Sequence, residues 1–172
     1  MIAFKVVKGK LSKKNMFCNV EILFKQKSKT VKALIDSGNL LKDPLTNVPV
    51  VVVEAEELKT LIPEEILEHI GEIIGGGSQD CLGEPQREEY ISKFRVIPFS
   101  SLGKKNGMLL GFKADYLLVD YEENIRKIEN AIIGIYGENF TKSKEYTAII
   151  GLDILEGSEE ENEHTSNVKI EY

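Results

Sequence analysis

The sequence has few of the features that are typical of disulfide-rich, membrane-spanning, secreted or nucleic-acid-binding proteins. It has two cysteines, Cys18 and Cys81, which are far apart and in no metal-ligand spacing, so we expect two reduced thiols rather than a disulfide scaffold. The longest apolar runs, such as residues 48–53, are far shorter than the roughly 20 residues that cross a bilayer, and no secretory signal is found. The net charge is −6, which argues against nucleic-acid binding because that needs a basic surface.

Histidines are equally scarce. His69 is expected on the polar side of a helix and His164 in the acidic C-terminal end, and neither has a cysteine, serine or histidine partner at a useful spacing. The sequence therefore predicts neither a catalytic triad nor a metal site, and no cofactor is expected.

The composition favours one globular unit. The chain has 172 residues, of which 42% are hydrophobic. Lysines gather between residues 5 and 32, and glutamates gather after residue 155, which is typical of solvated strand faces and of a disordered end. We therefore predict a folded domain over residues 1–156 and an acidic tail over residues 157–172.

Strand-like alternation recurs along most of the chain, with turn residues between the segments. The expected strands are residues 2–7, 16–25, 30–36, 49–54, 94–99, 108–119, 131–136 and 146–150. Residues 56–62 and 63–74 have helical spacing, and residues 152–155 are expected to start a short helix. The polar, glycine-rich residues 75–92 predict a mobile loop. The pattern indicates a mainly β fold with one helical insertion.

Two short segments suggest chemistry. Residues 33–38 (Ala-Leu-Ile-Asp-Ser-Gly) end an apolar strand in turn residues, and residues 148–155 (Ala-Ile-Ile-Gly-Leu-Asp-Ile-Leu) form an apolar strand that ends at a glycine. Each alone is typical of an ordinary turn or core strand. In this order, with a predicted hairpin at residues 94–119 between them, they resemble the aspartic peptidases of the retropepsin type, although Leu152 stands where that family often has arginine.

A longer resemblance covers nearly the whole chain. Residues 34–50, 95–103, 106–109 and 112–115 are similar to the sporulation sigma-factor-processing peptidases of endospore-forming bacteria, as is Asn39 after the glycine. This resemblance implies a retropepsin-like acid protease fold, a closed half of a β-barrel with a helical insertion after the catalytic loop. Members carry a multi-helix membrane part ahead of the peptidase domain, so the chain is expected to be an excised, soluble and cytoplasmic domain of a protein held in the cell membrane at the sporulation septum.

The resemblance also implies roles for particular residues. Asp36 is the expected catalytic aspartate, and the remaining predicted site residues support its loop (Ser37, Gly38, Asn39) or belong to the flap that covers substrate (Ser100, Ser101, Leu102, Gly103). A single-chain enzyme would need a second Asp-Thr/Ser-Gly in an apolar setting, and the sequence has none, so a homodimer is expected. The other aspartates near these motifs are interpreted as structural: Asp43, Asp115, Asp120 and Asp153.

The resemblance implies an aspartic endopeptidase that removes the N-terminal pro-segment of a sporulation sigma factor in the mother cell. Its implied partners are the pro-sigma factor, a second copy of the chain, and a signalling protein made in the forespore, with basic residues near the N-terminus facing anionic lipid. Two alternatives stay open: a non-catalytic module that dimerises or docks a partner, and a monomer that is inactive until an activator pairs it. Residues 168–172 alternate as an interleaved dimer strand would, but a disordered end fits equally well.

Overall fold

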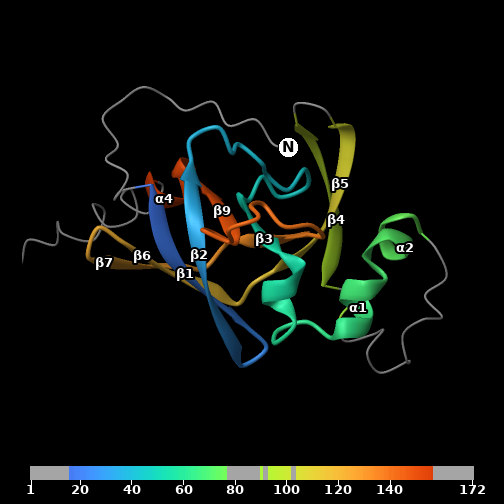
Figure 1. Ribbon diagram of the computed structural model, residues 1–172, viewed down its shortest axis with the longest axis horizontal. Helices are drawn as coiled ribbons and strands as arrows, with labels where there is room; N and C mark the ends of the chain where they lie inside the picture. The colour runs from blue at the N-terminus through green and yellow to red at the C-terminus, as the bar shows by residue number, and fades with distance from the viewer. Residues whose placement is uncertain (1–15, 77–89, 91–92, 102–103, 157–172) are drawn as a thin grey trace, which may run out of the picture.

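The described chain forms one mixed β-sheet with short helices beside it (Figure 1). The computed structural model describes residues 16–76, 90, 93–101 and 104–156. Nine strands pair in the order β4-β5-β8-β3-β9-β2-β1-β6-β7. Their bounds are β1 Phe17–Phe24, β2 Lys27–Asp36, β3 Val50–Glu54, β4 Phe94–Ser101, β5 Lys104–Lys113, β6 Tyr116–Tyr121, β7 Asn124–Ile128, β8 Ile132–Tyr136 and β9 Ala148–Gly151.

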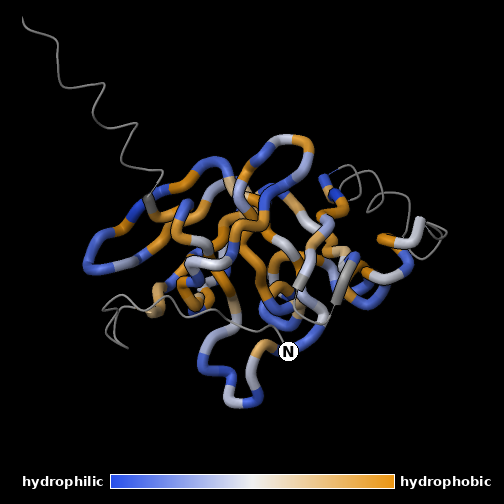
Figure 2. Tube along the Cα trace, turned by 90° about the horizontal axis from the view of Figure 1, so that it is seen from above, coloured by the Kyte–Doolittle hydropathy of each residue, from blue (hydrophilic) through white to orange (hydrophobic). Residues whose placement is uncertain are grey.

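The centre of the sheet is buried on both faces. Strand β3 runs parallel to β8 and antiparallel to β9, and every one of its residues is buried. Because side chains alternate along a strand, Val51 and Val53 join the main core, whereas Val50 and Val52 join a second cluster with Ile97. A strand covered on both faces reads as a continuous apolar run, as residues 48–53 do. In Figure 2 the apolar segments accordingly gather at the centre and the polar ones at the outer loops.

The helical insertion lies between β3 and β4, where the sequence predicts it, but its helices are shorter than expected. It consists of a 3-10 helix, η2 (Ala55–Leu58), followed by α1 (Glu64–Glu68) and α2 (Ile70–Ile74), which lie beside β4 and β5 in Figure 1. The single helix expected over residues 63–74 is interrupted at His69, whose Nδ1 donates to the Glu65 carbonyl oxygen at 2.7 Å. The His69 ring thus bonds to the Glu65 carbonyl oxygen, which in a continuous helix accepts a hydrogen bond from a backbone N–H.

One strand prediction near residue 115 is corrected, and one strand was missed. The strand expected over residues 108–119 is two strands, because Asp115 bonds to the first hairpin: its N–H donates to the Leu23 carbonyl oxygen, and its carboxylate accepts from the Lys25 N–H at 2.7 Å. The chain there leaves β8 and joins β1. Strand β7 was not predicted, since the turn before it is Glu122-Glu123, both with positive φ, where asparagine and glycine are usual.

The mainly β prediction is confirmed, but the described strands form an open sheet with β4 and β7 at its edges rather than a closed barrel. The expected short helix is present as α4 (Leu152–Glu156). Several predicted features lie outside the described residues: the strand at residues 2–7, most of the 75–92 loop, Cys81, His164 and the 157–172 tail. Within the described ranges, no helix has the length and apolar content needed to cross a membrane.

Candidate active site

Asp36 is the last residue of β2, where the chain turns out of the sheet. Strands β2 and β9 are parallel, so they end side by side, with Asp36 opposite Gly151 in the register. The Gly38 N–H donates to the Asp36 Oδ1 at 2.8 Å, and the Asn39 N–H donates to the Asp36 carbonyl oxygen at 3.1 Å. A Cβ on Gly38 would lie 3.2 Å from the same carboxylate oxygen, so glycine lets the turn close tightly around the aspartate.

Asn39 ties this turn to the centre of the sheet. Its amide Nδ2 donates to the Val50 carbonyl oxygen at 3.4 Å, and its Oδ1 accepts from the Leu41 N–H at 3.2 Å. The Val50 N–H in turn donates to the Leu41 carbonyl oxygen at 2.9 Å. Asn39 therefore fixes the direction in which the chain leaves Asp36. Ser37 lies half-buried in the same turn, and its expected role across a dimer stays a prediction.

Gly151 lets β9 pack directly against the turn. A Cβ at this position would meet the Asn39 carbonyl oxygen at 2.5 Å and the Asp153 Oδ1 at 2.7 Å, which is closer than such atoms approach. Asp153 also lies 3.7 Å from the Lys42 ammonium group. The turn at residues 36–39 and the glycine that ends β9 are thus brought into contact.

Asp36 opens into a cavity of about 340 Å³. The described residues that line it come from the Asp36 turn (Asp36, Gly38, Asn39, Leu40, Leu41), the β4–β5 hairpin (Pro98, Phe99, Ser100, Leu109) and strands or loops of the central sheet (Val52, Tyr136, Phe140, Ile149). Among them Asp36 is the one carboxylate, in a lining that is otherwise largely apolar. Such a cavity fits an extended chain with apolar side chains beside a group that moves protons.

The β4–β5 hairpin reaches over this cavity. Strand β5 pairs with β8 only from Leu110 to Lys113, so the rest of the hairpin is held by pairing between its own strands. Near its end, Phe99 lies opposite Gly107, where an added Cβ would sit 2.4 Å from the aromatic ring. Ser100 lines the cavity, and its expected flap role stays a prediction; the Ser101 side chain, Leu102 and Gly103 lie outside the described part.

The aromatic wall of the cavity was not found from the sequence. Tyr136 and Phe140 are stacked, with ring centroids 4.8 Å apart, and Phe140 lies 5.9 Å from Tyr146. Burial, and then the negative charge of Asp36, raise the pKa of Tyr146, so its phenol stays neutral beside the aspartate. No local sequence pattern distinguishes aromatic residues at the end of a strand and in the following loop as parts of a site. Only their position in the folded structure shows that they line the cavity.

An ion pair with a buried carboxylate joins the segment after the Asp36 turn to the β4–β5 hairpin. Asp43, only 1% exposed, accepts a hydrogen bond from the Arg95 guanidinium of β4 at 2.7 Å and another from the Thr46 hydroxyl. Burial alone would raise the pKa of Asp43, but these bonds and the Arg95 charge hold it below its ordinary value. Within the described residues, no group of three His, Cys, Asp or Glu side chains is arranged to hold a metal ion.

Comparison of the sequence with known families identifies the family of the chain. The sequence profile described as sporulation factor SpoIIGA, a peptidase family, matches residues 1–154. The chain belongs to this family. A sporulation sigma-E factor-processing peptidase of Priestia megaterium is 33% identical over 77% of the chain, and one of Bacillus subtilis is 30% identical over 74%. A putative sporulation sigma factor-processing peptidase of Bacillus thuringiensis is 28% identical over 76% of the chain and 79% of its own length.

The chain spans about two fifths of the first two relatives, 42% and 40% of their lengths. No solved structure matches the chain closely enough to test the retropepsin-like fold. The family is thus established by sequence, while the fold assignment beyond a mainly β sheet stays a prediction.

Proposed function

We propose that the chain is the catalytic part of an aspartic endopeptidase that activates a sporulation sigma factor by removing its N-terminal pro-segment. The observation that carries this proposal is the position of Asp36, in a glycine-supported turn at the floor of a cavity that the β4–β5 hairpin overhangs. The names of the family relatives supply the substrate, the precursor of sporulation sigma-E factor.

In this proposal two copies of the chain pair so that their Asp36 side chains meet. Two carboxylates that close share one proton, because like charges at short distance are costly to ionise together. The ionised carboxylate takes a proton from a water molecule, which attacks the scissile carbonyl carbon, while the protonated carboxyl donates to the carbonyl oxygen. The carboxyl group that took its proton from water then donates that proton to the leaving amine nitrogen. The carbon–nitrogen bond breaks, which completes hydrolysis of the peptide bond.

The substrate in this proposal is an extended peptide that lies between the Asp36 turn and the flap. Extended chains bind by backbone pairing with strands, and the side chains select the sequence through pockets. The walls formed by Phe99, Tyr136 and Phe140 favour apolar or aromatic side chains next to the cleaved bond. Closing the hairpin would exclude water from the reacting groups.

The test is cleavage of the sigma factor precursor in a host that lacks the pathway, with the natural activating partner supplied. Asp36→Asn removes the charge and keeps the shape, and it is expected to abolish processing. The matched control is Asp120→Asn, on an exposed residue of β6 outside the cavity, which should process normally. Normal processing by Asp36→Asn would make the turn structural and leave the chain as a docking or dimerisation module.

A further inference from the structure

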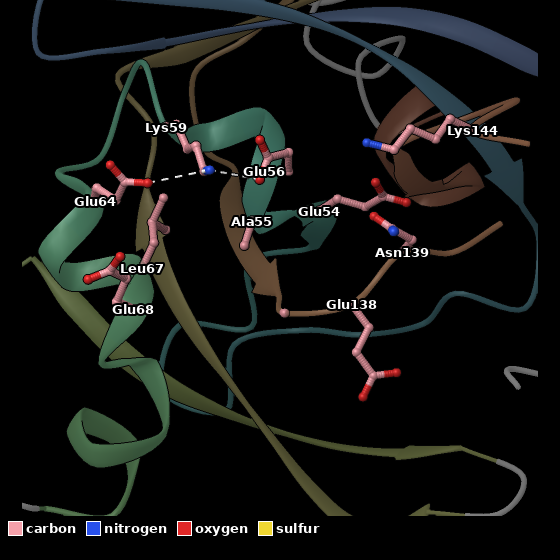
Figure 3. Close-up of a pocket in the computed structure, with 11 residues that line it drawn as sticks. Glu54, Ala55, Glu56, Lys59, Glu64, Leu67, Glu68, Glu138, Asn139 and Lys144 are labelled. Carbon is pink, nitrogen blue, oxygen red and sulfur yellow. Dashed lines mark ion pairs between the residues drawn. The ribbon is translucent and has the colours of Figure 1, made fainter. Parts of the chain in front are cut away.

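A second cavity, of about 440 Å³, lies among η2, α1 and the loop that follows β8 (Figure 3). None of the residues that line it belongs to the Asp36 cavity. Its described lining includes five glutamates and two lysines, so it carries a net negative charge. Lys59 is already paired with Glu56 at 2.9 Å and with Glu64 at 3.4 Å. The other charged residues of the described lining are three glutamates, Glu54, Glu68 and Glu138, and one lysine, Lys144.

The decisive residue is Glu54, the last residue of β3. Its side chain is fully buried, with 0% exposed, and its Oε1 accepts the Phe140 N–H at 2.7 Å. Its second oxygen, Oε2, is buried as well and has no hydrogen-bond partner among the described residues. A buried carboxylate oxygen without a donor is costly, and native proteins rarely keep one unless a ligand or water meets it. In Figure 3 the Glu54 carboxylate lies at the cavity, on the side of Asn139 and Lys144.

We propose that this cavity binds one basic side chain, an arginine or a lysine, of a peptide segment from a partner protein. An organic cation fits better than a metal ion, because the described carboxylates form no cluster with metal-ligand spacing. A guanidinium can donate to Glu54 Oε2 and to a glutamate at the rim at once. Ala55 and Leu67, also in the lining, offer apolar surface for the aliphatic stem of such a side chain.

Lys144 of the chain itself would compete with an external cation for the glutamates of this cavity. It lines the same cavity, and its charge acts on Glu56, yet no bond joins it to Glu54 in the structure. If an external cation occupies the cavity, removing the Lys144 charge should strengthen binding.

An occupied cavity would border the candidate catalytic site. Glu54 accepts a hydrogen bond from the Phe140 N–H, while the Phe140 ring lines the Asp36 cavity and stacks on Tyr136. The loop between β8 and β9 is therefore shared by the two cavities. The proposal itself does not depend on Asp36 or on peptidase activity.

The experiment is a titration of the 172-residue chain with N-acetyl-arginine amide, followed by NMR shifts of the backbone amides. The isosteric neutral probe is N-acetyl-citrulline amide. We expect saturable shifts at Gly137, Asn139 and Phe140 with the arginine probe and none with the citrulline probe. Equal shifts with both probes, or no saturable shifts with arginine, would overturn the proposal.

Substitutions inside and outside the cavity lining test whether the arginine probe binds in this cavity. Glu54→Gln keeps an acceptor for the Phe140 N–H and should weaken binding at least about tenfold, as loss of a charge-assisted hydrogen bond does. Glu68→Gln, exposed on α1, should weaken it about two- to fivefold, whereas its exposed neighbour Glu65→Gln, outside the lining, should leave it unchanged. Lys144→Ala should bind about twofold more tightly. Equal effects of Glu68→Gln and Glu65→Gln, or weaker binding by Lys144→Ala, would contradict the assignment even if Glu54→Gln fails to fold.

Discussion

The ion pair between Asp43 and Arg95 is predicted to hold the β4–β5 hairpin in register with the Asp36 turn. Asp43 lies in the segment that follows this turn, and Arg95 lies in β4 of the hairpin, so the pair joins segments that are 52 positions apart in sequence. A hydrogen bond to a charged group contributes about 1.5–3 kcal/mol to stability. Because the Arg95 side chain is 28% exposed and partly screened, we expect about 2 kcal/mol, or a loss of about 4–8 °C in Tm, for Asp43→Asn.

The assay is a double-mutant cycle with Asp43→Asn, Arg95→Met and the two together, followed by chemical denaturation. The two changes should be far from additive, since either one alone removes the pair. Lys29→Met, which breaks the more exposed Lys29–Glu57 pair at 2.9 Å, is the matched control and should cost less than about 1 kcal/mol. Additive effects of Asp43→Asn and Arg95→Met would refute the reasoning.

The dependence of stability on pH gives an independent check on the Asp43–Arg95 ion pair. The folded-state pKa of Asp43 is lowered below the ordinary value of 3.8, so the stability that its charge contributes is complete above that value and is lost as the pH falls through the folded-state pKa. The stability difference between wild type and Asp43→Asn should therefore be constant near neutral pH and shrink below about pH 4. A difference that stays constant through this acidic range would show that the charge of Asp43 contributes nothing.

Three further predictions concern single residues. Gly107→Ala would place a Cβ 2.4 Å from the Phe99 ring and displace it, so the KM for an apolar peptide should rise while the fold persists by circular dichroism; an unchanged KM would remove Phe99 from the substrate wall. Gly151→Ala would collide with the Asn39 carbonyl oxygen and should lower Tm by several degrees, and an unchanged Tm would show that the turn has room to move. Burial raises the pKa of Cys18 from 9.0 to about 12, so at pH 8 its alkylation, followed by mass spectrometry, should be about a thousandfold slower than in the unfolded chain; comparable rates would contradict its burial.

The sequence predicts those parts of the fold whose signal is local. The first hairpin alternates, and residues 48–53 form an apolar run, so β1, β2 and β3 are found within a few residues of their observed ends. The apolar strands that lead into Asp36-Ser37-Gly38 and end at Gly151 predict the position of the candidate site. Their contact, with the Asn39 carbonyl oxygen against Gly151, is a tertiary feature that only the parallel pairing of β2 with β9 produces.

The missed features depend on contacts between distant segments. The break between β5 and β6 is set by bonds from Asp115 to the end of β1 and the turn after it, which no local pattern contains. Strand β7 follows a turn of two glutamates with positive φ, a conformation that residue preference alone disfavours. Tyr136 ends β8 and Phe140 lies in the loop after it, so only their placement in the folded sheet brings them to the Asp36 cavity. In each case the tertiary context outweighs the local preference of the residues.

In the proposed mechanism Asp36 supplies one of the two carboxylates that the reaction uses, and this gives the sharpest test of the dimer. When wild type and Asp36→Asn are expressed together at equal levels and pair at random, about one quarter of the pairs carry two aspartates. Processing should then fall to about one quarter of that given by the same total amount of wild type. If each chain cleaved alone, about one half would remain, because half of the chains would still be active. An equal mixture with Asp120→Asn should lose nothing, which separates the need for a second Asp36 from simple dilution.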